Sequence, residues 1–172
     1  MTPQTPEQGG VCSWSMLPQS PRHMAEIMRE LGLVKLQLGL VPHRDDAGIV
    51  DGVPDALAAV GAKVVSGMFG TVGEDYSTLE TIKVTGGIVP DEHWGENQKI
   101  ARGAAAKASE FGLPAVQFHA GFLPHDMESA EFVKLADRIQ VVAGTFAEKG
   151  VELVFESGQE TAEDLNAFFD HL

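Results

Sequence analysis

Five apolar runs alternate with helical segments along the chain, and this alternation constrains the fold more than any other feature of the sequence. The runs predict strands over residues 11–17, 34–41, 62–69, 115–121 and 151–155. Strands that alternate with helices pair in parallel, because each helix returns the chain to the same end of the sheet. The sequence therefore predicts an α/β fold built around a five-stranded parallel sheet.

Capping residues mark where two of the helices begin. Ser20 precedes Pro21, a residue favoured at the first helical position, and Gly32 follows the last residue of the apolar stripe. Thr161 precedes a final helix whose first turn is acidic, which suits the positive end of the helix dipole. Apolar residues at helical spacing predict the other helices over residues 52–60, 96–111 and 128–150.

Residues 71–95 interrupt this pattern. They contain glycines and prolines and show no sustained apolar period. A loop of this length inside a compact domain is usually functional, for example as a lid over a binding site. We therefore expect a long functional loop after the third strand.

The length and composition indicate one globular domain. We expect it to span residues 11–172 after a flexible leader at residues 1–10. No apolar run approaches the roughly 18 residues that a membrane span needs, and the leader lacks the features of a signal peptide. Cys12 is the single cysteine, so an internal disulfide and a cysteine-based zinc cluster are excluded. These features predict a cytoplasmic protein with no membrane partner.

The charge of the chain argues against nucleic acid as a partner. The sequence has 12 Lys and Arg residues against 25 Asp and Glu residues, a formal net charge of −13. A phosphate backbone would be repelled unless basic residues were concentrated on one face, and no basic cluster is visible in the sequence.

Polar and aromatic residues follow the predicted strands. Two architectures fit the alternation: a complete five-stranded flavodoxin-like sheet, or the first five units of an eight-stranded (β/α)₈ barrel. In both, ligands bind at the carboxyl ends of the strands. The candidates there are Trp14, His43, Arg44, Phe69, His119 and Glu156. Each also has a structural interpretation, since a glutamate at a strand end can cap a helix and an indole can belong to the core.

Three separated motifs resemble one known family. TGGIVPDEHW (residues 85–94), FHAGFLPHD (118–126) and FESGQETAEDL (155–165) are similar in order and spacing to the sugar phosphate isomerase/epimerase family, the xylose isomerase-like TIM barrels. The resemblance extends from about residue 11 to the last helix. It implies a partial parallel-stranded (β/α)₈ barrel of about five β/α units.

The resemblance also implies a site. Glu156 matches the family's metal ligand after strand 5, and it is also the carboxylate expected to transfer a proton beside the carbonyl of a carbohydrate substrate. The metal would be a divalent ion such as Mn²⁺, Mg²⁺, Co²⁺ or Zn²⁺, which polarises that carbonyl. His119 and Glu160 match positions that face the substrate, and Trp14 is expected in the wall of the same pocket.

The sequence departs from the family in its number of strands. A complete barrel has eight strands, and three of the four usual metal ligands follow strands 6 to 8. We therefore expect the metal to bind weakly or not at all, and this chain alone to be incomplete or inactive. Its open edge strands would allow homo-oligomers to form. Two alternatives stay open: a non-catalytic α/β module that binds small molecules or partners, and a relative of metal-dependent abasic-site endonucleases, which the negative charge disfavours.

Overall fold

A computed structural model of the chain describes residues 9–40, 49–156, 158 and 160–172. His43, Arg44 and most of the predicted leader lie outside the described residues. None of the described helices combines the length and the hydropathy that crossing a bilayer requires.

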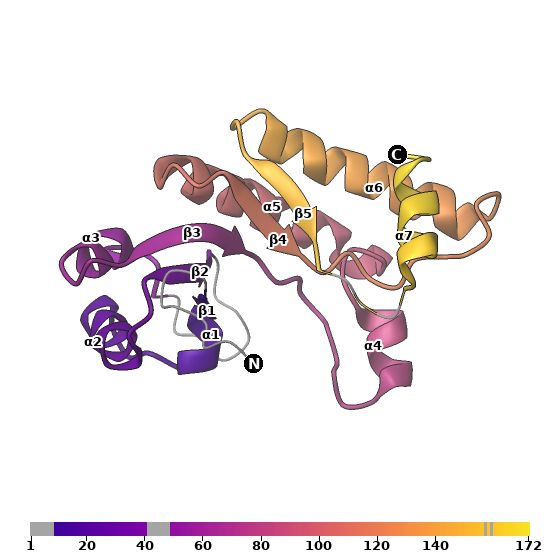
Figure 1. Ribbon diagram of the computed structural model, residues 1–172. Helices are drawn as coiled ribbons and strands as arrows, with labels where there is room; N and C mark the ends of the chain where they lie inside the picture. Colours follow the sequence, from indigo (N-terminus) through magenta and orange to yellow (C-terminus); the bar gives the residue numbers. More distant parts are fainter. Residues whose placement is uncertain (1–8, 41–48, 157, 159) are drawn as a thin grey trace.

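The described strands form a single parallel sheet (Figure 1). They are β1 (Val11–Cys12), β2 (Lys35–Gly39), β3 (Lys63–Met68), β4 (Ala115–Phe118) and β5 (Glu152–Phe155). Their order in the sheet is the order in the sequence, and every neighbouring pair is parallel. A flavodoxin-like sheet has the order 2-1-3-4-5, whereas a (β/α)₈ barrel adds its strands in sequence order. The strand order therefore confirms the partial barrel.

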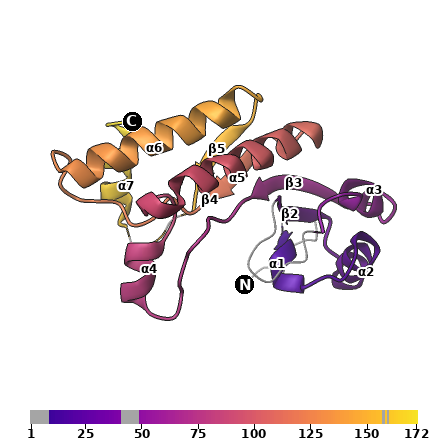
Figure 2. The same ribbon diagram turned by 180° about the vertical axis from the view of Figure 1, so that it is seen from behind.

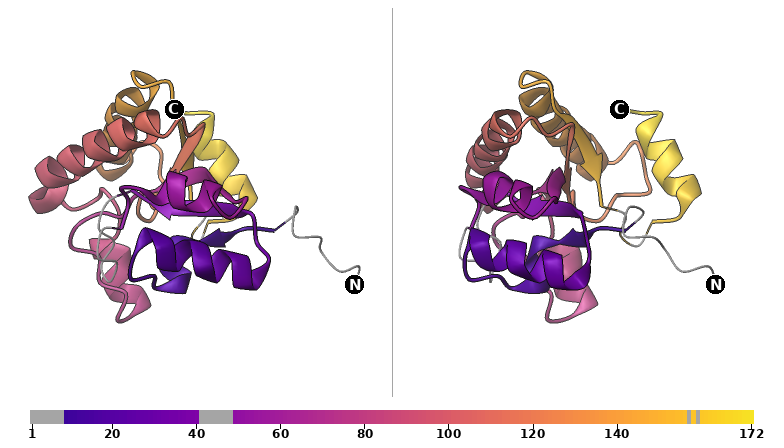
Figure 3. Two further views of the ribbon diagram at one scale, coloured as in Figure 1. Left: turned by 90° about the vertical axis from the view of Figure 1, so that its left-hand side faces the viewer. Right: turned by 60° about the vertical axis from the view of Figure 1, so that its left-hand side comes forward.

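The described helices are α1 (Ser13–Met16), α2 (Pro21–Leu31), α3 (Val53–Ala58), α4 (Leu79–Thr85), α5 (Asp91–Glu110), α6 (Ala130–Ala147) and α7 (Ala162–Phe169). Four of them, α2, α3, α5 and α6, lie along the convex side of this curved sheet (Figures 1 and 2). Helix α2 packs on α3, and α5 packs on α6. Helix α4 differs from the others because it projects away from the sheet, and the turned views of Figure 3 show it apart from the layer of long helices.

Both predicted helix caps are confirmed. The Ser20 hydroxyl accepts a hydrogen bond from the His23 N–H at 3.1 Å, and Gly32 ends α2 in the left-handed conformation. The Thr161 hydroxyl accepts from the Asp164 N–H, while the Asp164 carboxylate accepts from the Thr161 N–H. These bonds satisfy backbone N–H groups that have no partner within the helix.

The core lies between the sheet and the helices. Alternate strand residues are fully buried on this side, among them Leu36, Leu38, Val116 and Phe118. The Phe118 ring stacks on Phe69 with centroids 5.2 Å apart. Because neighbouring residues of a strand point to opposite faces, the residues between them lie on the concave face of the sheet.

Two sequence predictions are wrong in detail. The sequence predicts a first strand over residues 11–17, but the strand ends at Cys12. The buried Ser13 begins α1, and its hydroxyl accepts a hydrogen bond from the Gly39 N–H. The expected loop over residues 71–95 contains α4 and the first turn of α5. Helix α4 has seven residues, too few for an apolar period to be visible, and a Thr78–Thr81 capping box stabilises its first turn.

Candidate functional site

A row of polar side chains crosses the concave face of the sheet. The Cys12 thiol donates to Gln37 Oε1 at 3.3 Å, and the Gln37 amide donates to Gln117 Oε1 at 2.8 Å. His119 lies two residues after Gln117, and so the strand alternation directs it to the same face. The polar character of this face continues to the carboxyl ends of the strands, where ligands bind in parallel α/β folds.

The ends of β4 and β5 meet beside α4. The Glu156 N–H donates to the Phe118 carbonyl at 2.9 Å, which keeps the two strand ends in register. A cavity of about 370 Å³ opens here, lined by Tyr76, Thr78, Leu79, Ile82, His119, Phe122, Glu156 and Gly158. The sequence-predicted residues His119 and Glu156 therefore line one cavity. Its opposite wall is largely apolar and comes from α4 and the residues just before it.

A buried carboxylate holds the His119 ring. Glu74 Oε1 lies 3.2 Å from His119 Nδ1, and the side chains are 8% and 14% exposed respectively. The same oxygen accepts a hydrogen bond from the Gly87 N–H at 3.0 Å. The hydrogen bond to Glu74 raises the pKa of His119 despite burial, and the charges of Glu74, Glu156 and Glu160 raise this pKa further. Burial raises the pKa of Glu74, but the bonds from His119 and Gly87 outweigh it and leave this pKa below its ordinary value.

Sequence reasoning missed Glu74. It lies in the segment that has no apolar period, and its partner His119 is 45 positions further along the chain. No spacing rule connects two such residues. The one sequence signal in this region is the unusual length of the segment after the third strand.

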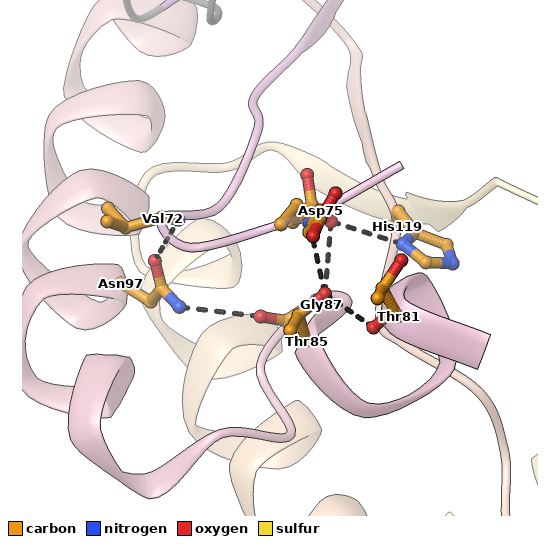
Figure 4. A network of polar contacts seen from close by, with 8 residues as sticks. Val72, Asp75, Thr81, Thr85, Gly87, Asn97 and His119 are labelled. Atoms are coloured by element: carbon orange, nitrogen blue, oxygen red, sulfur yellow. Dashed lines mark hydrogen bonds and ion pairs between the residues drawn. The ribbon is translucent and has the colours of Figure 1, made fainter. Parts of the chain in front are cut away.

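Asn97 anchors the segment that carries Glu74. Asn97 is 1% exposed; its side-chain oxygen accepts from the Val72 N–H at 2.9 Å and its amide donates to the Gly87 carbonyl at 3.4 Å. The Asp75 N–H donates to the Thr85 hydroxyl at 3.0 Å (Figure 4). These bonds connect the residues before and after α4 to α5. The wall that α4 contributes to the cavity is thus attached at both of its ends.

The other two residues predicted to contact a substrate, Glu160 and Trp14, are not in the lining of the cavity beside His119. Glu160 accepts hydrogen bonds from the Leu123 N–H at 3.2 Å and from the Gly158 N–H at 3.2 Å, so it braces the loops after β4 and β5. Trp14 is half-buried in α1 and does not line the cavity beside His119. Contact of either residue with a substrate stays a prediction.

Comparisons with known proteins agree on the fold. No family model matches the sequence, and neither does any curated protein. A xylose isomerase domain protein from Planctomyces limnophilus is 26% identical, with a TM-score of 0.75 over 85% of this chain and 52% of its own. The chain is a partial barrel of the xylose isomerase-like type.

Two further structures of this barrel type carry ligands. A D-allulose 3-epimerase from Methylomonas sp., solved with D-allulose, is 14% identical, with a TM-score of 0.63 over 94% of this chain and 57% of its own. A xylose isomerase-like TIM barrel protein from Mycobacterium smegmatis, solved with magnesium, is 16% identical, with a TM-score of 0.58 over 87% and 52%. The present xylose isomerase-like chain spans about half the length of these proteins.

The described part of this xylose isomerase-like barrel does not by itself fit a complete metal site. Within residues 9–40 and 49–172, apart from positions 157 and 159, no three His, Cys, Asp or Glu side chains converge as ligands for one ion. Glu156 is exposed toward the cavity, whereas both carboxylate oxygens of Glu160 accept backbone hydrogen bonds. These residues offer one available carboxylate.

Proposed function

We propose that the chain forms the sugar-binding and proton-transfer part of an isomerase or epimerase site. The observation that supports this most is that Glu156 and His119 line one cavity at the carboxyl ends of β5 and β4. The cavity volume of about 370 Å³ falls in the range of small-molecule sites, roughly 300–1,000 Å³. The D-allulose 3-epimerase that shares this fold is solved with a ketohexose, and a sugar of that size suits the cavity.

Glu156 is the proposed proton-transfer group. Its exposed carboxylate takes the proton from the hydroxyl-bearing carbon beside a ketone. The electron pair of that C–H bond forms a C=C bond with the carbonyl carbon, and the π pair of the carbonyl moves to its oxygen, which gives an enediolate. Return of this proton by Glu156 to the former carbonyl carbon, with transfer of the hydroxyl proton to the other oxygen, completes an isomerisation. An epimerisation instead requires that solvent water delivers a proton to the opposite face of the original carbon. In the same cavity, His119 binds an oxygen of the sugar.

We further propose that Glu156 is the contribution of this chain to a divalent metal site. The other ligands that the resemblance implies do not lie among the described residues. A bound divalent cation would polarise the substrate carbonyl. With Glu156 as its one available ligand among the described residues, we expect the chain by itself to bind Mn²⁺ weakly and to turn over slowly.

Exchange of a carbon-bound proton tests this function. The chain is incubated with D-allulose, D-tagatose or D-fructose in D₂O with Mn²⁺, and NMR follows deuterium at the carbons beside the carbonyl. We expect saturable binding of at least one sugar and slow exchange that Glu156→Gln abolishes. Glu152→Gln is the matched control, because Glu152 is an exposed glutamate at the other end of β5, and it should leave the exchange unchanged.

Two outcomes would contradict a catalytic site in this chain. No saturable binding of any of the three sugars by the folded chain would exclude the proposed function. Binding without exchange would favour the alternative of a non-catalytic sugar-binding module, which the single available carboxylate of the site supports.

A further inference from the structure

The contacts of Glu74 fix the orientation of the His119 ring. An ionised carboxylate can only accept hydrogen bonds, so the 3.2 Å contact between Glu74 Oε1 and His119 Nδ1 requires the proton to be on Nδ1. Nε2 lies on the other side of the ring, and a Cβ atom added at Gly158 would be 3.9 Å from it. Since Gly158 lines the cavity, Nε2 faces the cavity.

We propose that Glu74 is a positioning residue that keeps Nδ1 of His119 protonated and directs Nε2 toward an oxygen of the ligand. The inference deepens the proposed function, and it rests on that function for the identity of the ligand. The ligand class that fits is a neutral polyhydroxylated carbonyl compound. One oxygen of this compound accepts from the imidazolium Nε2–H, while its C–H bond faces Glu156.

The charges around the ring support this assignment. Among the described residues, the charged groups that act on His119 are Glu74 from the segment after β3 and Glu156 and Glu160 after β5, all acidic. Ile82 of α4, in the wall of the cavity, is apolar. Three acidic groups near one imidazole favour its protonated form, in which Nε2–H is a donor. The net negative charge that remains on these groups favours a neutral ligand over a phosphorylated one.

Glu74 is itself held in place. The Gly87 N–H donates to the oxygen that accepts from His119, and Asn97 binds both Val72 and the Gly87 carbonyl. The carboxylate is therefore positioned before any ligand arrives. A preorganised partner of this kind reduces the reorganisation that binding would otherwise require.

NMR of the imidazole nitrogens tests the proposal in the 172-residue chain without any ligand. At a pH where the ring is neutral, we expect the ¹⁵N shifts of His119 to report the Nδ1–H form. Free imidazole side chains in water favour the Nε2–H form, so Glu74→Ala should shift His119 toward Nε2–H. Glu74→Gln retains the acceptor oxygen, so it should preserve Nδ1–H while lowering the pKa of His119. Glu80→Gln is the matched control, because Glu80 is an exposed glutamate in α4. This substitution should change neither the tautomer nor the pKa of His119.

The possible outcomes test the role of Glu74 separately from the proposed sugar function. An Nε2–H form in the wild-type chain, or an unchanged pKa of His119 in Glu74→Gln, would overturn the role of Glu74, and the second test does not depend on Glu74→Ala being folded. Titration with D-allulose then examines the ligand: we expect the Nε2 resonance to shift, and to shift less in Glu74→Ala. An Nδ1–H ring that does not respond to D-allulose, D-tagatose or D-fructose would leave the positioning role intact and exclude the sugar.

Discussion

Glu74 and His119 stabilise each other's charged forms, and this couples the stability of the fold to pH. The pKa of His119 is raised above its ordinary value of 6.5, first by the bond to Glu74, and the pKa of Glu74 lies below its ordinary value of 4.5. The contribution of His119 is complete below pH 6.5 and is lost as the pH rises through its higher folded pKa. The contribution of Glu74 is present above pH 4.5 and is lost as the pH falls through its lower folded pKa.

We therefore predict that this pair stabilises the fold most between these two ordinary pKa values and that the free energy of unfolding declines above pH 6.5. Urea denaturation from about pH 5 to about pH 9 measures the decline. In Glu74→Gln the decline should be smaller, because His119 then has less affinity for its proton in the folded state. Glu80→Gln should follow the wild-type curve, and equal pH slopes in all three proteins would contradict the prediction.

How much of the site could be predicted depends on the residue. His119 and Glu156 were identified because each follows a buried strand, and the carboxyl ends of parallel strands meet at one rim. Glu74 could not be identified in this way, because it follows no strand directly and is fixed by bonds to residues far along the chain. The use of Glu160 as a brace for two loops likewise depends on tertiary contacts that no local pattern encodes.

At the scale of elements, the turn after α4 approaches the end of β4 so closely that only glycine fits. Gly87 has φ +66°, and a Cβ atom there would overlap the Ala120 carbonyl group and the Gly121 nitrogen. Gly87→Ala must therefore move backbone away from β4. We predict that it lowers the free energy of unfolding by about 2–5 kcal/mol, the sum of left-handed strain and overpacking. Urea denaturation measures the loss.

Gly32 provides the control for this substitution. Gly32 has a similar φ of +65°, and nothing lies within 4 Å of an added Cβ atom. Gly32→Ala therefore isolates the backbone strain and should cost about 1–2 kcal/mol. Equal losses in Gly87→Ala and Gly32→Ala would show that the approach to β4 is not tight.

Arg138 attaches the TGGIVPDEHW motif to α6. Its guanidinium is nearly buried and donates to the carbonyls of Ile88 and Val89 at 2.8 and 2.7 Å, and it also pairs with Asp91. Arg138→Met leaves buried carbonyl groups without a donor, so we predict a loss of about 2–4 kcal/mol in the free energy of unfolding. Lys134→Met removes an exposed ion pair to the same Asp91 and should cost less than about 1 kcal/mol. Comparable losses in the two variants, measured by urea denaturation, would contradict this role of Arg138.

The elements themselves were predictable where local signals were strong. Ser20, Pro21 and Gly32 define α2 almost completely, because each satisfies or terminates backbone hydrogen bonds locally. Helix α4 was missed because its seven residues expose Leu79 and Val84 to solvent and show no buried stripe. The alternation of strands and helices could not choose between a flavodoxin-like sheet and a barrel, since both produce it. The three separated motifs favoured the barrel, and the strand order confirmed it.

At the scale of the whole molecule, β1 and β5 are the edges of the described sheet. Beside β5 lies an apolar cavity of about 500 Å³, lined by Ile139, Ala143, Glu152, Leu153, Val154, Phe155, Leu165, Phe169 and Leu172. The edge of β5 that does not face β4 offers backbone N–H and C=O groups to another strand. An apolar surface next to such an edge favours association between copies, whereas the net charge of −13 opposes it through a repulsion that salt screens.

We therefore predict that this 172-residue chain self-associates through β5 and that association increases with salt. Sedimentation velocity at low and at high ionic strength measures it. Val154→Lys places a charge on β5 and should shift the chain toward the monomer, because a lysine on an edge strand must lose water when another strand pairs with it. Val133→Lys is the control: Val133 is an exposed valine on α6 outside the lining of the cavity, and this change adds the same charge. Equal effects of the two lysines would assign the shift to net charge alone, and a monomer at high salt would exclude association through β5.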